Sequence, residues 1–107
     1  MSLREKQSKF AHMVALLILH AEQLGFEVTG GDWYRDPRST YGHPRSLHRK
    51  RLAFDPNLFL DGRYLDGNHS ETDKAYNDLH DFWDSIGGAK RIKKDLIHFS
   101  LEHDGVR

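Results

Sequence analysis

The sequence predicts a single α+β domain over residues 1–107, with two main helices and a small antiparallel sheet. Two segments repeat apolar residues at helical spacing, and several short apolar segments are separated by Gly, Pro and Asp, which is typical of strands. A length of 107 residues suits one domain with a modest core. The chain contains no cysteine, which excludes disulfides, Cys-based zinc sites and thiol nucleophiles.

The first expected element is an amphipathic helix over residues 3–24, which Gly25 is placed to end. Residues 26–29 alternate apolar and polar side chains, which predicts a short, half-buried strand. Residues 30–50 are expected to form a long loop, and their aromatic side chains argue against simple disorder. The buried face of the helix is predicted to consist of Phe10, Met13, Val14, Leu17, Ala21 and Leu24.

A β-hairpin is expected around the dipeptide Asp61-Gly62, which is typical of two-residue hairpin turns. Its two strands would contain residues 58–60 and 64–65. A brief apolar stretch over residues 52–55 precedes this hairpin.

A second helix is expected over about residues 71–86, with Ser70 as its N-cap. A basic linker then leads to a last strand over residues 97–101. Residues 102–107 are predicted to be a frayed tail. The buried face of the second helix is predicted to consist of Tyr76, Leu79, Trp83 and Ile86.

The 16 basic and 16 acidic residues give a formal net charge of zero, which argues against a protein that binds bulk polyanions. The most apolar stretch, residues 13–19, is far shorter than the ~20 residues that cross a bilayer. No signal peptide is recognisable. We therefore expect a monomer made in the cytoplasm, without membrane insertion and without a nucleic-acid partner.

Eight histidines are the unusual feature of the composition, and histidine is the commonest metal ligand. His48 lies seven residues before Asp55, and Asp95 lies three residues before His98. A catalytic zinc ion takes three protein ligands and leaves one position for water. His48, Asp55 and His98 can fill those three positions for one Zn²⁺ ion, which leaves Asp95 to accept a proton from the water. Spacing alone supports this hypothesis weakly, because so many histidines offer several such sets.

Each of these residues also has an ordinary structural interpretation. His48 can be a solvated loop residue, and His98 can be a strand histidine satisfied by packing. Asp55 can cap a turn, Asp95 can be a surface acid, and Arg35 can pair with an acidic neighbour. The other histidines are expected to be surface or packing residues: His12, His20, His43, His69, His80 and His103.

Several motifs occur in a fixed order over about residues 10–101. They are Tyr34-Arg35, Ser46-x-His48-x6-Asp55, Ala53-Phe54-Asp55, Leu58-Phe59-Leu60-Asp61-Gly62-Arg63-Tyr64-Leu65, Phe82-Trp83-Asp84-Ser85-Ile86-Gly87 and Asp95-x-x-His98-Phe99. This order resembles that of the zinc peptidases of the hedgehog/DD-peptidase superfamily. That superfamily includes D-Ala-D-Ala carboxypeptidases and dipeptidases and the phage L-alanyl-D-glutamate endolysins.

The resemblance implies a hedgehog/DD-peptidase-like fold and a zinc peptidase that cleaves peptidoglycan stem peptides. Both L-Ala-D-Glu endopeptidase and D-Ala-D-Ala carboxypeptidase activity are open, with endolysin-like lysis of the cell wall after release from the cell. Asp95 would be the general base, and Arg35 would hold a substrate carboxylate or the developing oxyanion. Ser46 and Tyr34 would support the site or the substrate. The implied zinc ligands are His48, Asp55 and His98.

Two positions depart from the pattern. Arg51 replaces a glycine that many relatives have three residues after the first histidine, and Pro56 replaces an apolar residue after the aspartate. These departures leave open a non-catalytic domain of the same fold that binds murein or a protein partner. A small nucleic-acid-binding module based on the basic runs is a weaker alternative, because the net charge is zero.

Overall fold

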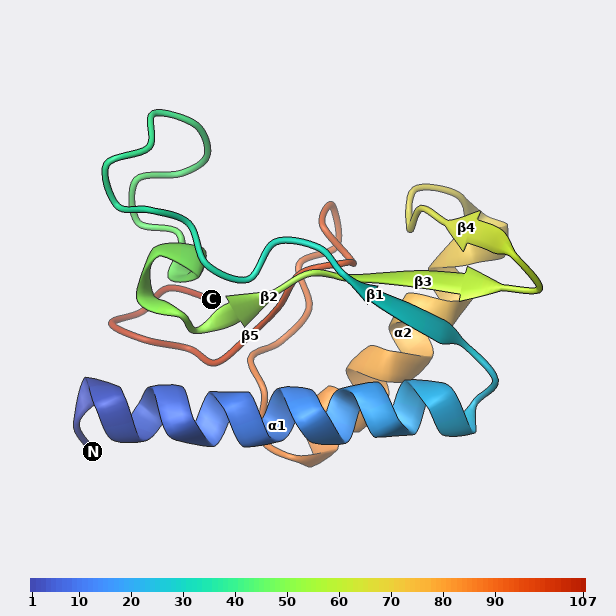
Figure 1. Cartoon of the computed structure of the whole chain (residues 1–107), viewed down its shortest axis with the longest axis horizontal. Coiled ribbons are helices and arrows are strands. Elements are labelled where there is room, and N and C mark those ends of the chain that lie inside the picture. Colours follow the sequence, from blue (N-terminus) through green and yellow to red (C-terminus); the bar gives the residue numbers. More distant parts are fainter.

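The computed structural model describes all 107 residues and confirms the α+β class (Figure 1). Helix α1 (Leu3–Gln23) begins with a capping box, in which Ser2 Oγ accepts from the Glu5 N–H at 3.1 Å and the Glu5 carboxylate accepts from the Ser2 N–H at 3.0 Å. It ends in a Schellman motif with Gly25 at φ +93°. The predicted buried face is confirmed except for Leu24, which is 46% exposed because it is the C-cap residue, where the chain leaves the helix.

The β-structure is divided between two antiparallel sheets. The larger sheet has the strand order β1-β3-β4. The smaller sheet pairs β2 with β5, and each of these strands contains two residues. The strand bounds are β1 (Glu27–Gly30), β2 (Ala53–Phe54), β3 (Pro56–Leu60), β4 (Arg63–Leu65) and β5 (Phe99–Ser100). The expected last strand over residues 97–101 is therefore shorter, because residues 92–98 form successive turns instead.

The predicted hairpin is confirmed as β3 and β4. Asp61 and Gly62 connect the two strands with φ values of +52° and +79°, and positive φ at both positions is what a type I′ turn requires. Pro56 is the first residue of β3, a position where a missing N–H is tolerated. Figure 1 shows this hairpin at one end of the strand layer and the β2–β5 pair toward the other.

Helix α2 (Ser70–Ser85) is confirmed, but the predicted Ser70 cap is wrong. The N-cap residue is His69, which makes no side-chain capping bond. The entry to the helix is held instead by Asp66, whose Oδ1 accepts from the Asn68 N–H at 2.9 Å and from Thr72 Oγ1 at 3.0 Å. The helix therefore begins at Ser70, one residue earlier than the sequence pattern predicts.

The prediction of a frayed tail over residues 102–107 is also wrong. His103 and Val106 exchange two backbone hydrogen bonds of 2.9 Å, which close a turn. His103 Nδ1 lies 3.3 Å from Lys6 Nζ, and Val106 packs against the core. Tertiary contacts to distant parts of the chain therefore order this segment, which we name the C-terminal turn.

The core lies where the two helices meet the smaller sheet. Trp83 of α2 is fully buried and meets Phe10 of α1 and Phe99 of β5 edge to face, with ring centroids 5.8 and 5.9 Å apart. Trp83 Nε1 also donates to the Ser100 carbonyl at 2.8 Å. One side chain thus joins both helices to β5. Neither helix combines the length and apolar composition that crossing a bilayer requires.

Candidate metal centre

His48 is held in a 3-10 helix, η1 (Leu47–Lys50), inside the segment expected to be loop. Ser46 caps this helix, because its Oγ accepts from the His48 N–H at 3.3 Å. His48 Nδ1 lies 3.2 Å from the Trp33 carbonyl oxygen, which can only accept a hydrogen bond. Nδ1 therefore carries a proton, and the lone pair of the neutral ring lies on Nε2.

Asp55 occupies the single position between β2 and β3. Its N–H donates to the Asp32 carbonyl at 2.8 Å, and its carbonyl accepts from the Gly31 N–H at 2.9 Å. A Cβ atom at position 31 would overlap that carbonyl oxygen, so glycine permits the close approach. The backbone of Asp55 is thus fixed on both sides, and its side chain is largely buried.

The β2–β5 pairing brings His98 next to Asp55. Phe54 is paired with Phe99, so the residue after Phe54 and the residue before Phe99 lie at the same end of the antiparallel pair. The His98 N–H donates to the Asp95 carbonyl at 3.1 Å, which places both residues in one turn. Two segments more than 40 positions apart in the sequence therefore meet at this sheet end.

The three side chains have the separations expected of ligands to one ion. Asp55 Oδ1 lies 3.3 Å from His48 Nε2 and 3.4 Å from His98 Nδ1, and donor atoms of all three residues lie within 4.8 Å of one another. Ligand atoms about 2.0–2.1 Å from a tetrahedral metal are about 3.3–3.4 Å apart. Asp55 Oδ1 is buried and accepts no hydrogen bond of good geometry, so it faces the two nitrogens without a proton well placed between them. The residues present therefore fit a metal ion.

The charges of the three side chains stabilise one another. Burial lowers the pKa of His48, but the Asp55 carboxylate and the Trp33 carbonyl together outweigh this effect, so the pKa lies above its usual value. Burial raises the pKa of Asp55, but the two imidazoles outweigh that effect, so the pKa lies below its usual value. These opposing shifts of the pKa values show that the group favours positive charge beside the Asp55 carboxylate.

Asp95 and Arg35 line the same cleft of about 430 Å³ as His48 and His98. Partial burial is the largest influence on the pKa of Asp95 and raises it above its usual value. The Asp55 carboxylate also raises this pKa, whereas His98 lowers it. Arg35 is the more firmly held of the two. Its guanidinium lies 3.4 Å from the Asp32 carboxylate and over the Tyr41 ring, and its Nε is buried without a partner.

The two remaining candidate residues lie in different places. Ser46 lines the cleft beside His48. Tyr34 is not among the residues that line it; instead its ring lies under the Arg51 guanidinium, 3.9 Å from the ring centroid. Arg51 has φ +55°, in the left-handed region that favours glycine, and this stacking contact offsets part of the strain.

Sequence reasoning missed several groups of the cleft. His43 and Arg107 line it, although His43 was assigned to the surface or packing class and residue 107 to a frayed tail. Gly42 lies so close to Arg35 that a Cβ atom there would overlap the guanidinium. The Trp33 carbonyl that orients His48 has no sequence signal, because every residue carries such a group. Gly42 is the one group here that the sequence could have indicated, because it is a glycine in a loop rich in aromatic residues.

Comparison of the chain with protein-family models, with curated proteins and with solved structures finds no match.

Proposed function

We propose that this protein is a zinc-dependent peptidase that hydrolyses peptide bonds in peptidoglycan stem peptides, in the manner of phage endolysins. The observation that carries the proposal is the set of 3.3 and 3.4 Å separations among His48, Asp55 and His98. The cleft around this group also contains a carboxylate, Asp95, and a well-held cation, Arg35. The order of motifs that resembles the hedgehog/DD-peptidase superfamily supplies the substrate class, L-Ala-D-Glu or D-Ala-D-Ala type linkages.

Two imidazoles and one carboxylate are donors that suit zinc and leave a fourth position open. When bound, the ion would supply Lewis-acid polarisation of a carbonyl oxygen and would lower the pKa of a water molecule. The Trp33 carbonyl keeps the His48 ring in one tautomer and orientation for this role.

Hydrolysis requires one proton to move from the attacking water to the leaving amine. Asp95 takes this proton as the new C–O bond forms, and it returns the proton to the nitrogen as the amide C–N bond breaks. Its raised pKa makes the carboxylate a better proton acceptor than an ordinary aspartate. Arg35 binds a substrate carboxylate or the negative charge that develops on the carbonyl oxygen.

The two departures from the family pattern are compatible with this activity. Arg51 adopts the left-handed conformation that a glycine would provide at this position. Pro56 lacks a backbone N–H, but it is the first residue of β3, where this loss is tolerated. Asp55 still makes both of its backbone hydrogen bonds. Neither departure removes a group from the cleft.

Metal binding tests the first half of the proposal. The purified protein should bind one equivalent of zinc, measured by elemental analysis and by calorimetry. Zinc at 100 times its Kd should stabilise the folded state by about 2.7 kcal/mol. His48→Ala and Asp55→Ala should abolish both effects, whereas His12→Ala, on the exposed surface of α1, should retain them. Full zinc binding by Asp55→Ala would contradict the assignment of the ligands.

Digestion of purified muropeptides tests the second half. Asp95→Asn should keep the zinc but lower kcat by about 10²–10⁴-fold, because it cannot accept the proton. Glu27→Gln, which removes an exposed carboxylate on β1, is the matched control and should cleave normally. Zinc binding without turnover of any muropeptide would favour the non-catalytic, murein-binding alternative.

A further inference from the structure

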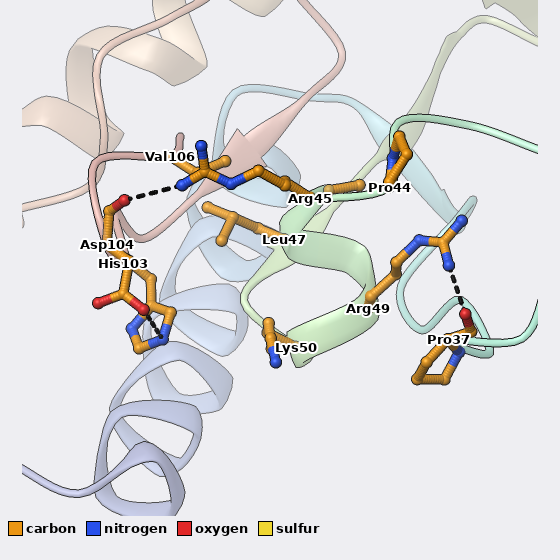
Figure 2. Close-up of a pocket in the computed structure, with 10 residues that line it drawn as sticks. Pro37, Pro44, Arg45, Leu47, Arg49, Lys50, His103, Asp104 and Val106 are labelled. Carbon is orange, nitrogen blue, oxygen red and sulfur yellow. Dashed lines mark hydrogen bonds and ion pairs between the residues drawn. The ribbon is translucent and has the colours of Figure 1, made fainter.

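A second cavity lies beside the metal cleft, between η1 and the C-terminal turn. Its volume is about 310 Å³, and residues from both segments line it. Figure 2 shows Arg45 reaching across to the C-terminal turn, where it donates to the Asp104 carbonyl at 3.2 Å. Arg49 extends in the other direction and donates to the Pro37 carbonyl at 2.6 Å. We name this cavity the basic pocket.

The cations of the basic pocket have no acidic partners. Arg45, Arg49 and Lys50 make no ion pair, whereas Arg35, Arg38, Arg63 and Arg91 each pair with a carboxylate. The guanidinium groups of Arg45 and Arg49 bond only to neutral carbonyl oxygens, so their charge is not compensated. The one carboxylate in the lining, Asp104, lies 3.3 Å from His103 Nε2. The pocket therefore has a net positive charge.

Arg45 and Lys50 are the cations that are free to bind a ligand. Arg49 donates to the carbonyls of Pro37, Ser39 and Tyr41, so its role is to hold the loop. Arg45 makes one such bond, and both Arg45 and Lys50 are exposed. A variant of Arg45 or Lys50 therefore tests the charge of the pocket without disturbing the loop.

The basic pocket adjoins the metal cleft. Ser46, Leu47 and Val106 line both cavities, and Ser46 and Leu47 directly precede the candidate ligand His48. A ligand that lies in the metal cleft and extends past this shared wall reaches Arg45 and Lys50. The two cavities are thus neighbouring parts of one surface.

The distribution of charge favours a short acidic ligand over a polyanion. A polyanion requires a continuous cationic surface, but in the second basic stretch of the sequence, residues 90–94, Arg91 forms ion pairs of 2.6 and 3.2 Å with Asp81 and Asp84. A pocket with a few uncompensated cations suits single carboxylate groups. We propose that the basic pocket binds a carboxylate of an acidic peptide whose scissile bond lies at the metal centre, an inference that rests on the proposed peptidase function.

The test compares an acidic stem tetrapeptide with its analogue in which every carboxylate is amidated. Binding is measured by calorimetry on zinc-loaded Asp95→Asn, which does not turn the peptide over, and kinetics are measured on the protein with Asp95 intact. In both backgrounds, adding Arg45→Gln and Lys50→Gln together should weaken binding of the acidic peptide or raise its KM by about tenfold, with kcat unchanged. The amidated peptide should bind equally with and without these changes. Lys9→Gln, on the exposed surface of α1, is the matched control.

Equal affinity for the acidic peptide with and without the Arg45→Gln and Lys50→Gln changes would overturn the proposal. An equal loss of affinity for the amidated peptide would also overturn it. So would binding of a single-stranded oligonucleotide, but not of the peptide, that depends on Arg45 and Lys50. Chelator-treated protein separates this proposal from the proposed function. If the zinc-loaded protein cleaves no peptide but the chelator-treated protein still binds the acidic peptide in a manner that depends on Arg45, only the peptidase assignment fails.

Discussion

The two sheets of this protein differ in how they are held together. The β1-β3-β4 sheet depends on regular pairing, with seven paired positions in register and a type I′ turn that its own sequence encodes. The β2–β5 sheet has two paired positions, yet it places Asp55 and His98 at the same end. All four of its residues are buried, and Trp83 and His80 of α2 contact it.

This difference teaches that the candidate site depends on a very short strand pair, which packing against α2 holds in place. His80 lies stacked on Phe99 with ring centroids 3.9 Å apart, and its Nε2 donates to the Leu96 carbonyl at 2.8 Å. Changes in the smaller sheet should therefore affect both stability and metal binding, whereas changes at the hairpin end of the larger sheet should affect stability alone.

The largest effect is expected from Phe99→Ala. Phe99 is fully buried between Trp83 and His80, so its removal should lower the free energy of unfolding by about 3–5 kcal/mol and also weaken zinc binding. The matched change in the larger sheet is Phe59→Ala, a half-buried ring beside Tyr64. It should lower the free energy of unfolding by about 1–2 kcal/mol and leave the zinc affinity unchanged. Urea unfolding and zinc titration measure both; equal loss of zinc affinity in the two variants would refute the comparison.

The next largest effect, a loss of about 3 kcal/mol in the free energy of unfolding, is expected when the pH is lowered. Burial lowers the pKa of His80 to about 4, against an unfolded value of about 6.5. The unfolded state therefore takes up the proton first as the pH falls. The contribution of neutral His80 is complete above about pH 6.5 and is lost progressively down through pH 4.

His80→Gln tests this, because glutamine keeps a donor near the Leu96 carbonyl but does not titrate. The difference in stability between wild type and His80→Gln should change by about 3 kcal/mol between pH 7 and pH 4, in the direction that disfavours wild type at low pH. Groups that titrate in both proteins, such as His48 and Asp55, cancel in this difference. A difference independent of pH would show that His80 is not held neutral.

The smallest effect is expected from Gly62→Ala in the hairpin turn. A Cβ atom at position 62 has open space around it, so the only cost is the positive φ of +79°. Thermal unfolding should show a loss of about 1 kcal/mol, with unchanged zinc affinity. A larger loss, or weaker zinc binding, would mean that the larger sheet supports the site more than its position suggests.

Local patterns predicted the elements that depend on neighbouring residues. Helical periodicity predicted the buried face of α1, and a left-handed cap predicted its end at Gly25. Turn chemistry predicted the hairpin at Asp61-Gly62. The Ser70 cap was mistaken because the start of α2 is held by Asp66. This residue lies four positions before Ser70, and the capping pattern considers only residues after the cap. The tail was mistaken because residues distant in sequence order it: Lys6 contacts His103, and Val106 packs against the core.

The sequence by itself determined the α+β class, because periodicity is a local property. Its order of motifs, through the family resemblance, indicated His48, Asp55, Asp95 and His98 as the candidate site residues. Only the tertiary structure decided that Asp55 Oδ1 lies within 3.4 Å of both imidazoles, since that depends on the pairing of β2 with β5 and on the α2 residues behind it. It also decided that His43 and Arg107 line the cleft and that the C-terminal turn forms one wall of the basic pocket. Such contacts join residues far apart in the chain, and no local pattern records them.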